Sequence, residues 1–278
     1  MTFPLRDAVA VVTGAANGIG AALAMRLASR GCRLALVDRD ADALAAAASK
    51  ARAAGVAVSA HAADVADPAA AECLHEAVLA EHARVTVLIN NAGVALLGRF
   101  DEVSLADMEW LLAINFWGTV RMCKAFLPAL RQQPAAQIVN LSSVFGIVAP
   151  AGQTAYAASK FAVRGFSEAL RHELEDTGIG VSIVHPGYVK TAIARNARIP
   201  AAMSPQEAAE RVANFDRLSG NTPETAAARI VEGIERRRKR ILVGADAVRL
   251  DLLQRMFPVS YWARIKRRAA RSRPPAAP

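Results

Sequence analysis

The first ninety residues alternate between short apolar runs and longer segments in which apolar and polar residues follow a helical spacing. The short runs are "AVAVVTG" at 8–14, "RLALVD" at 33–38, "VAVSAHAADV" at 56–65 and "VTVLINNAG" at 85–93. The longer segments include "IGAALAMRLASRG" at 19–31, which a glycine closes, and an alanine-rich run after residue 38. Strands that alternate with helices predict an α/β fold with a doubly wound parallel sheet, whose ligand site lies at the carboxyl ends of the strands.

The turn after the first predicted strand is rich in glycine. It reads "TGAANGIG", with Gly14, Gly18 and Gly20 in a G-x-x-x-G-x-G spacing. Glycine lets the backbone approach a pyrophosphate closely, and the amide groups and dipole of the following helix N-terminus favour its negative charge. Asp38 ends the next strand about twenty residues later, as in dinucleotide-binding folds. The pattern therefore predicts a dinucleotide site; a purely structural turn is the alternative.

Tyr156 and Lys160 lie four residues apart in the alanine-rich stretch "TAYAASKFAVRGF", which favours a helix. Residues at i and i+4 share one helix face, so an ammonium would lie beside a phenol. A neighbouring positive charge lowers the pKa of a phenol, which could then act as a general acid or base. The spacing alone is more typical of a surface tyrosine and lysine, so other motifs have to decide.

Seven segments of the chain, in order, resemble motifs of the short-chain dehydrogenase/reductase family. The resemblance covers roughly residues 7–245 and implies a Rossmann fold with Tyr156 and Lys160 in the active site. The matching segments are "TGAANGIG", "DV" at Asp64 and Val65, "NNAG" at 90–93, Asn115 in "INFWG", "NLSS" ending at Ser143, "YAASK" and "PGYVKT" at 186–191.

The resemblance implies a role for each catalytic position. Tyr156 would exchange a proton with the substrate oxygen while hydride passes to or from the nicotinamide. Lys160 would lower the pKa of Tyr156 and hold the nicotinamide ribose, and Ser143 would hydrogen-bond the substrate oxygen, with Ser142 as the less favoured partner. Asn115 would anchor a water in a proton relay from Lys160 to solvent, although a buried structural asparagine is the alternative.

The same resemblance implies the cofactor site, and Asp38 favours NAD over NADP because its carboxylate would repel a 2'-phosphate. Arg39 could pair with that phosphate, but position 17, where NADP-preferring relatives often carry a basic residue, is Asn17. The predicted cofactor-binding residues are Gly14, Asn17, Gly18, Ile19, Gly20, Asp38, Asp64, Val65, Asn91, Ala92, Gly93, Tyr156, Lys160, Pro186, Gly187, Val189 and Thr191.

The residues expected around the substrate are mostly apolar. They are Val144, Phe145, Ile147, Val148, Tyr188, Ile193, Met203, Phe215 and Leu218. This lining favours a lipophilic secondary alcohol or its ketone, unless half of these side chains pack into the core instead. We interpret His185, just before the Pro-Gly turn, as structural. A dinucleotide-binding sensor or scaffold without turnover is the alternative function.

Composition adds limits on location and partners. The chain has 278 residues, 53% of them hydrophobic, so it can bury a large core as one domain, which we place at residues 1–245. It has no apolar run of membrane-spanning length and no signal-peptide layout, so we expect a cytoplasmic protein. Its three scattered cysteines suggest reduced, buried thiols and no metal site. The resemblance also implies a homodimer or homotetramer, through helices expected at 105–130 and 154–175.

The net charge of +9 comes from the C-terminal end. Residues 229–278 carry 14 Lys and Arg against 4 Asp and Glu, whereas residues 1–228 carry 20 against 21. Residues 246–278 therefore form a basic amphipathic extension, with its last residues expected to be disordered. Its apolar face could pack on the body or on a partner subunit, which we favour, or it could make peripheral contact with an anionic membrane. Nucleic-acid binding is not expected, because the body offers no basic patch.

Overall fold

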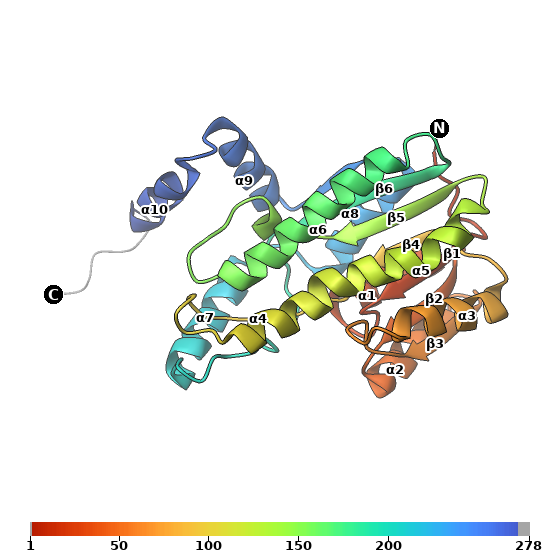
Figure 1. Ribbon diagram of the computed structural model, residues 1–278, viewed down its shortest axis with the longest axis horizontal. Coiled ribbons are helices and arrows are strands. Elements are labelled where there is room, and N and C mark those ends of the chain that lie inside the picture. The colour runs from red at the N-terminus through yellow and green to blue at the C-terminus, as the bar shows by residue number, and fades with distance from the viewer. Residues whose placement is uncertain (1, 272–278) are drawn as a thin grey trace.

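The computed structural model describes the backbone of residues 2–271 and the side chains of residues 2–267 (Figure 1). Our expectation of disorder at the C-terminus concerns residues that lie mostly outside the described part. Seven parallel strands form one sheet in the order β3-β2-β1-β4-β5-β6-β7. The strands are β1 Val9–Thr13, β2 Arg33–Asp38, β3 Val58–Ala62, β4 Val87–Asn90, β5 Ala136–Leu141, β6 Ile179–Pro186 and β7 Arg240–Val243.

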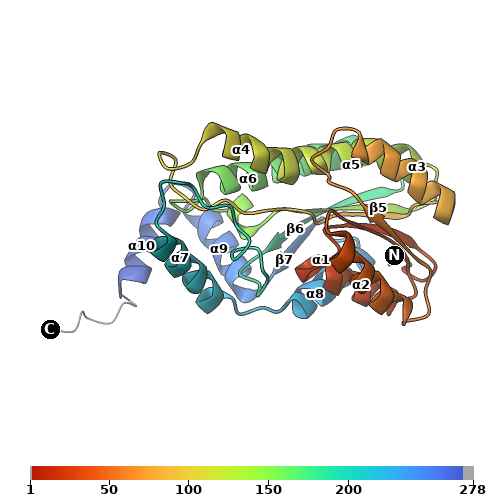
Figure 2. The same ribbon diagram turned by 90° about the horizontal axis from the view of Figure 1, so that it is seen from below.

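Helices cover both faces of the sheet, which confirms the predicted Rossmann-type α/β fold (Figure 2). Helices α1, α2 and α8 lie on one face, and α3, α5 and α6 lie on the other. The helical segments are α1 Gly18–Ala28, α2 Ala41–Arg52, α3 Ala70–His82, α4 Leu105–Leu112, η1 Ala113–Gly118, α5 Thr119–Arg131, η2 Val144–Gly146, α6 Thr154–Glu173, α7 Pro205–Leu218, α8 Pro223–Glu235, α9 Ala245–Met256 and α10 Tyr261–Arg271.

Burial on both faces explains why the central strands β1 and β4 are nearly continuous apolar runs rather than alternating ones. Along β1, Ala10 and Val12 pack into the cluster beneath α1 and α8, whereas Val11 points into the cluster beneath α3 and α5. A strand covered on both sides favours apolar residues on both of its faces, so the period of two disappears from the sequence. The polar residues that matter for chemistry therefore appear only where the strands end.

The helix expected over residues 105–130 is divided. A π-helical segment, Ala113–Gly118, separates α4 from α5 and contains Asn115. Trp117 is exposed on this segment and Phe161 is exposed on α6, as expected for a surface that pairs with another copy. Phe166, also on α6, is less exposed, because its ring packs edge-on against Phe116 with centroids 6.3 Å apart. Cys73, expected to be buried, is exposed.

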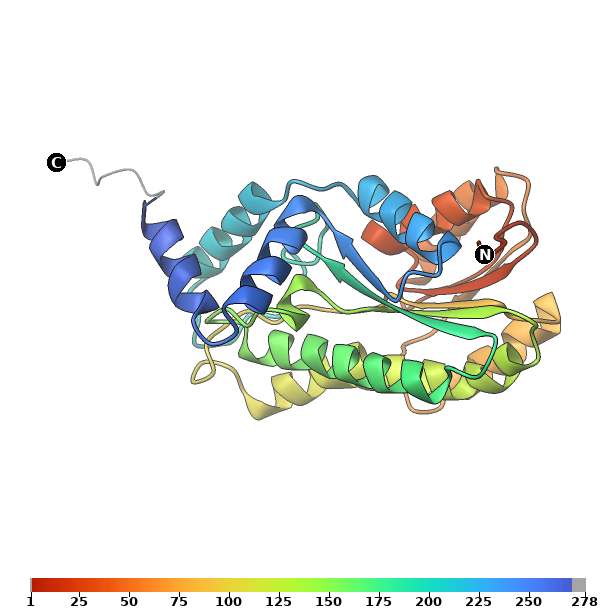
Figure 3. The same cartoon turned by 90° about the horizontal axis from the view of Figure 1, so that it is seen from above.

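The chain after β7 forms two helices at one end of the molecule. Helix α9 packs beside β7 and η2, and α10 extends away from the body (Figures 1 and 3). Within the described part of the chain, no helix has the length and apolar character needed to cross a membrane.

Candidate active site

The loops at the carboxyl ends of the strands surround one cavity of about 670 Å³. It runs from the glycine-rich turn after β1 to the aromatic side chains of Tyr188 and Phe215. A parallel sheet brings these strand ends to one edge, so residues distant in sequence share this cavity. All the predicted cofactor-binding residues except Gly20 line it, and so does Ser143.

The glycine-rich turn is shaped by close backbone contacts. Gly14 has a φ of +64°, and a Cβ at this position would lie 2.8 Å from the Cα of Ala92. Gly20 lies behind the cavity wall, where a Cβ would collide with the Gly14 carbonyl and lie 2.6 Å from the Asn91 amide nitrogen. Only glycine fits such approaches. The Asn91 side chain completes the turn by donating to the carbonyls of Thr13 and Gly14 at 2.8 and 3.0 Å.

The N-terminus of α1 faces the cavity with its first amides available. Asn17 precedes the helix in an extended conformation and makes no side-chain capping bond. The first turn of the helix also has no acidic residue. Uncapped amides at a helix N-terminus attract anions, so this wall fits the pyrophosphate of a dinucleotide.

Asp38 lies at the end of β2 and is fixed by two backbone amides. One carboxylate oxygen accepts from Ala16 N at 3.0 Å and the other accepts from Asp40 N at 3.1 Å. The first bond ties the acid to the glycine-rich turn. Arg39, which follows directly, is exposed and lines the same cavity. An acid and a base therefore both border the end of the cavity where an adenosine ribose would lie.

Tyr156 and Lys160 lie one turn apart on α6, as their spacing predicted. The Lys160 ammonium is 5.7 Å from the centre of the Tyr156 ring and donates to the Leu141 carbonyl at 3.1 Å. Lys160 is buried, whereas part of the Tyr156 ring faces the cavity. Gly93 packs against this lysine, because a Cβ on Gly93 would lie 3.3 Å from its Nζ atom.

The pKa values of the pair differ from the expectation that Lys160 lowers the pKa of Tyr156. Burial raises the pKa of Tyr156 to about 12, and an interaction with the Ser143 side chain only partly opposes this rise. Burial also lowers the pKa of Lys160 to about 8. Desolvation disfavours both the phenolate and the ammonium. For the pKa of Tyr156 it therefore outweighs the neighbouring positive charge of Lys160.

Ser142 and Ser143 follow β5 but point in different directions. The Ser142 hydroxyl donates to the Lys160 carbonyl at 2.8 Å, so this serine joins β5 to α6. The Ser143 hydroxyl accepts from Phe145 N at 3.1 Å and lies at the start of η2, beside Tyr156. The geometry therefore brings Ser143, rather than Ser142, to the tyrosine.

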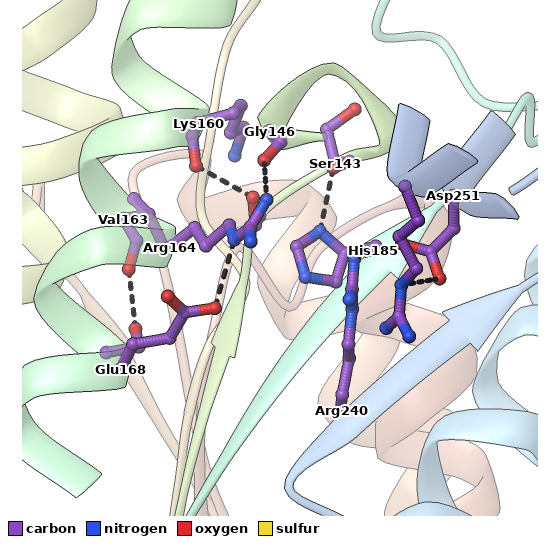
Figure 4. A network of polar contacts seen from close by, with 12 residues as sticks. Ser143, Gly146, Lys160, Val163, Arg164, Glu168, His185, Arg240 and Asp251 are labelled. Carbon is purple, nitrogen blue, oxygen red and sulfur yellow. Dashed lines mark hydrogen bonds and ion pairs between the residues drawn. The ribbon is translucent and has the colours of Figure 1, made fainter. Parts of the chain in front are cut away.

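His185 forms a hydrogen bond with the backbone of Ser143 (Figure 4). Its Nδ1 atom donates to the Ser143 carbonyl at 2.9 Å, and the ring is almost fully buried in β6. Burial lowers the pKa of His185 to about 4, so the ring is neutral. This arrangement agrees with our interpretation of His185 as structural.

Charged side chains surround His185 and connect it to neighbouring elements (Figure 4). Arg240 on β7 pairs with Asp251 on α9, which also pairs with Arg255. On the other side, Arg164 of α6 donates to the Gly146 carbonyl at 3.3 Å and pairs with Glu168. These contacts link α6, β6, β7 and α9 around the segment that contains Ser143.

Asn115 lies behind the catalytic pair rather than in the cavity lining. Its side-chain oxygen accepts from Val94 N at 2.8 Å, and its amide donates to the Val94 carbonyl and the Ser159 hydroxyl, both at 3.1 Å. A Cβ on Gly93 would lie 3.2 Å from its side-chain oxygen, so Asn115 is separated from Lys160 by a glycine. The π-helical backbone is the local feature that turns this residue toward α6.

The part of the cavity beyond Tyr156 is mainly aromatic and aliphatic. Phe145 contacts both Tyr156 and Tyr188 edge-on, with centroids 6.2 and 6.1 Å apart, and Tyr188 contacts Phe215 at 5.5 Å. Six of the nine expected residues line the cavity, and the other three, Ile147, Val148 and Met203, are buried in the core.

Four polar residues at this end were not anticipated from the sequence. They are Gln153, Asn196, Arg211 and Asn214. Arg211 lies on α7 and pairs with Glu207 at 2.7 Å, so much of its charge is already compensated. Their positions depend on how the loops after β5 and β6 fold, and the sequence "PQEAAERVANFDRL" of α7 gives only an ordinary amphipathic pattern.

Comparison with known proteins places this geometry in a family. The family model described as short chain dehydrogenase matches residues 8–201. SadH of Mycobacterium tuberculosis is 43% identical over 256 residues, which cover 91% of this chain and 92% of SadH.

Solved structures agree with this assignment. A short-chain dehydrogenase/reductase from Burkholderia phymatum in complex with NAD has a TM-score of 0.85 at 31% identity, with 99% of each chain covered. A short-chain dehydrogenase from Burkholderia cenocepacia J2315 in complex with NADP has a TM-score of 0.76 at 29% identity, with 88% of this chain and all of the other covered. The chain belongs to the short-chain dehydrogenase/reductase family, an oxidoreductase family that binds NAD or NADP.

Proposed function

We propose that the protein interconverts a lipophilic secondary alcohol and its ketone, with Tyr156 as the general acid and base. The observation that carries this proposal is the position of Tyr156, between Ser143 and Lys160 on one side and an aromatic cavity wall on the other. A bound nicotinamide cofactor would supply or accept the hydride, and its oxidised ring would add a positive charge.

The residues of the chain would handle the proton and the substrate oxygen. The Ser143 hydroxyl would hydrogen-bond that oxygen, and Tyr156 would give or take the proton at the same atom. Lys160, held by the Leu141 carbonyl, would present its ammonium to the tyrosine and to the cofactor ribose. Asn115 would hold a water behind Lys160. The aromatic wall would exclude solvent from the reacting atoms.

The cofactor proposed is NAD. Asp38 supports this choice because its carboxylate, fixed by two amides, would face the adenosine ribose and repel a 2'-phosphate. Arg39 beside it is the feature that would favour NADP. Fluorescence titration of the two reduced cofactors against the same protein tests the choice, and tighter binding of NADPH would reverse it.

We propose that residues 1–245 form the catalytic domain and that the protein acts as a homodimer or homotetramer. A cytoplasmic location stays a prediction from the sequence.

Replacing Tyr156 with phenylalanine tests the reaction. Tyr156→Phe keeps the ring but removes the transferable proton, so turnover should fall by a factor of roughly 100 or more. Absorbance of the reduced nicotinamide, followed with a panel of lipophilic alcohols and ketones, measures this loss. Cofactor titration of the same variant is the control and should be nearly unchanged.

Near-normal turnover of Tyr156→Phe would contradict the mechanism. Cofactor binding without turnover of any compound in the panel by the unmodified protein would favour the alternative, a dinucleotide-binding sensor or scaffold.

A further inference from the structure

Helix α9 presents an apolar ridge to the outside of the molecule. Val248, Leu252 and Met256 recur every four residues and are 42%, 51% and 63% exposed. Val259, in the turn that leads to α10, is 94% exposed. The opposite face of α9 is the packed one, since Ala247 and Leu250 lie against Val144, Ile147 and Val148. The ridge therefore lies on the outer face of α9, whereas the inner face of this helix packs against the body of the protein.

Cations surround this ridge. Arg249 and Arg255 flank it on the two sides of α9, and α10 adds further basic side chains directly after the turn. We call the ridge, Val259 and these cations the arm surface. Its exposed cations are Arg249, Arg255, Arg264, Lys266 and Arg267. Of these, Arg255 is paired with Asp251 at 3.1 Å.

The acidic residues of the same segment face inward. Within residues 245–267 these are Asp246 and Asp251. Asp246 accepts from Tyr188 N at 2.7 Å, and Asp251 is 4% exposed and pairs with Arg240. Because the carboxylates are used internally, the outward charge of the arm surface is positive.

Aromatic residues lie next to these cations. Phe257 stacks on the Arg264 guanidinium at 3.5 Å, and Trp262 and Ile265 are half-buried on α10. A helix with lysine and arginine on one face and tryptophan on another is typical of segments that lie in the interface of a bilayer. The aliphatic ridge of α9 would enter the acyl boundary while the cations meet lipid phosphates and carboxylates.

We propose that the arm surface docks the protein on an anionic lipid surface. Charge distinguishes this occupant from a second copy of the chain. Two copies meeting through the same surface would bring their cations together around the apolar ridge, at an electrostatic cost. An anionic bilayer offers both the opposite charge and an apolar layer.

The arm surface is also joined to the wall of the cavity. The Tyr261 hydroxyl, at the start of α10, accepts from Ala149 N at 3.1 Å, and Pro150 and Ala151 line the cavity directly after that residue. Docking through the arm would thus hold this part of the cavity wall near the bilayer. The docking itself can be measured without any substrate.

Co-sedimentation with vesicles tests the proposal. The probes are vesicles of phosphatidylcholine with about 30% phosphatidylserine and vesicles of phosphatidylcholine alone. The full-length protein should bind the anionic vesicles at about 0.05 M salt and be largely released at about 0.5 M, because salt screens exposed charges. Equal binding to both kinds of vesicle would overturn the proposal.

Two variants and two matched controls locate the surface. The triple variant Arg264→Gln, Lys266→Gln, Arg267→Gln should lower the partition coefficient about five-fold for each charge removed, or roughly 100-fold in total. The control triple Arg26→Gln, Lys50→Gln, Arg131→Gln removes the same charge from exposed positions on the body and should bind like the parent protein.

The apolar ridge is tested in the same way. Leu252→Ser with Met256→Ser should weaken binding to the anionic vesicles at the lower salt concentration, whereas Leu105→Ser, at an exposed leucine on α4, should not. Circular dichroism and cofactor titration establish that each variant folds. Parent-like vesicle binding by either arm variant overturns the proposal. If the ridge variant instead dissociates an oligomer in sedimentation, the surface is a contact between copies.

Discussion

The pKa values of single side chains in the site depend on burial more than on the spacing of charged residues in the sequence. The i, i+4 relation of Tyr156 and Lys160 holds, yet burial moves the pKa of each group against its charged form. The sequence identifies which groups are neighbours on a helix, but it does not give the desolvation that each one experiences. The Ser143 side chain favours the phenolate in part, and the positive charge of an oxidised nicotinamide ring would favour it further.

His185 provides a test of this burial through the stability of the protein. In the folded state its pKa is lowered to about 4, chiefly by burial. The bond to the Ser143 carbonyl and the charge of Asp251 act against this shift, and the charges of Arg240 and Arg164 add to it. Between about pH 6.5 and pH 4 the unfolded chain binds a proton that the folded protein excludes. The free energy of unfolding should therefore fall by up to about 3 kcal/mol as the pH decreases through this window.

His185→Asn should remove this loss. Its side-chain amide can still donate to the Ser143 carbonyl but does not titrate. Urea unfolding of both proteins at several pH values measures the difference, and His61 and His82, whose pKa values are also lowered, contribute equally to both. Parallel pH dependence in the two proteins would show that His185 is not held neutral.

At the scale of elements, the chain was predictable where one pattern runs without interruption. The first four strands and α6 were expected close to their observed bounds, because apolar runs and helical spacing act locally. The division of 105–130 by a π-helical segment was not predicted, since it depends on Asn115 bonding to Val94 and Ser159 from distant elements. The prediction that Ile147 and Val148 line the pocket was wrong for a similar reason. Both side chains pack against α9, and this contact between distant elements is not visible in the sequence.

The contact between η2 and α6 predicts the effect of one glycine. A Cβ on Gly146 would collide with the Ser142 hydroxyl and lie 2.7 Å from the Lys160 carbonyl. Gly146→Ala should therefore separate η2 from α6, cost about 1–3 kcal/mol of stability, and lower turnover because Ser143 begins the same element. Urea unfolding and initial rates measure the two effects.

Gly165 on α6 is the matched control, since a Cβ there meets nothing within 4 Å. Gly165→Ala should leave turnover unchanged and stabilise the helix by about 0.5–1 kcal/mol. Equal stability and turnover in both alanine variants would mean that the space between Gly146 and α6 accommodates a Cβ without strain.

At the scale of the whole molecule, the alternating pattern and the seven motifs were sufficient for the fold and the family, and both are confirmed. Asp38, the glycine-rich turn and the strand-end motifs converge because parallel strands end at one edge. The polar residues Arg211 and Asn214 in the cavity wall were not predicted, because α7 reaches the cavity only through the long connection after β6. Substrate preference depends on such connections, which have no regular pattern in the sequence.

Self-association is the prediction that belongs to the whole molecule. Trp117 and Phe161, at 50% and 38% exposure, lie on the helical layer formed by α4, η1, α5 and α6, which has no further layer outside it in the described chain. Exposed aromatic side chains of this kind are frequent anchors of interfaces. We expect a dimer or tetramer in sedimentation velocity at micromolar concentration, and Trp117→Arg with Phe161→Arg should weaken it at least about ten-fold.

The control for this prediction uses the opposite face of the sheet. Met25 is 41% exposed on α1, which packs beside α8 on that face of the sheet. Met25→Arg therefore adds a charge at a comparable apolar position without touching the proposed interface. It should sediment like the parent protein. A parent protein that sediments as a monomer would contradict the prediction. If the aromatic variant stays associated while Leu252→Ser with Met256→Ser dissociates, α9 rather than the α4–α6 layer joins the copies.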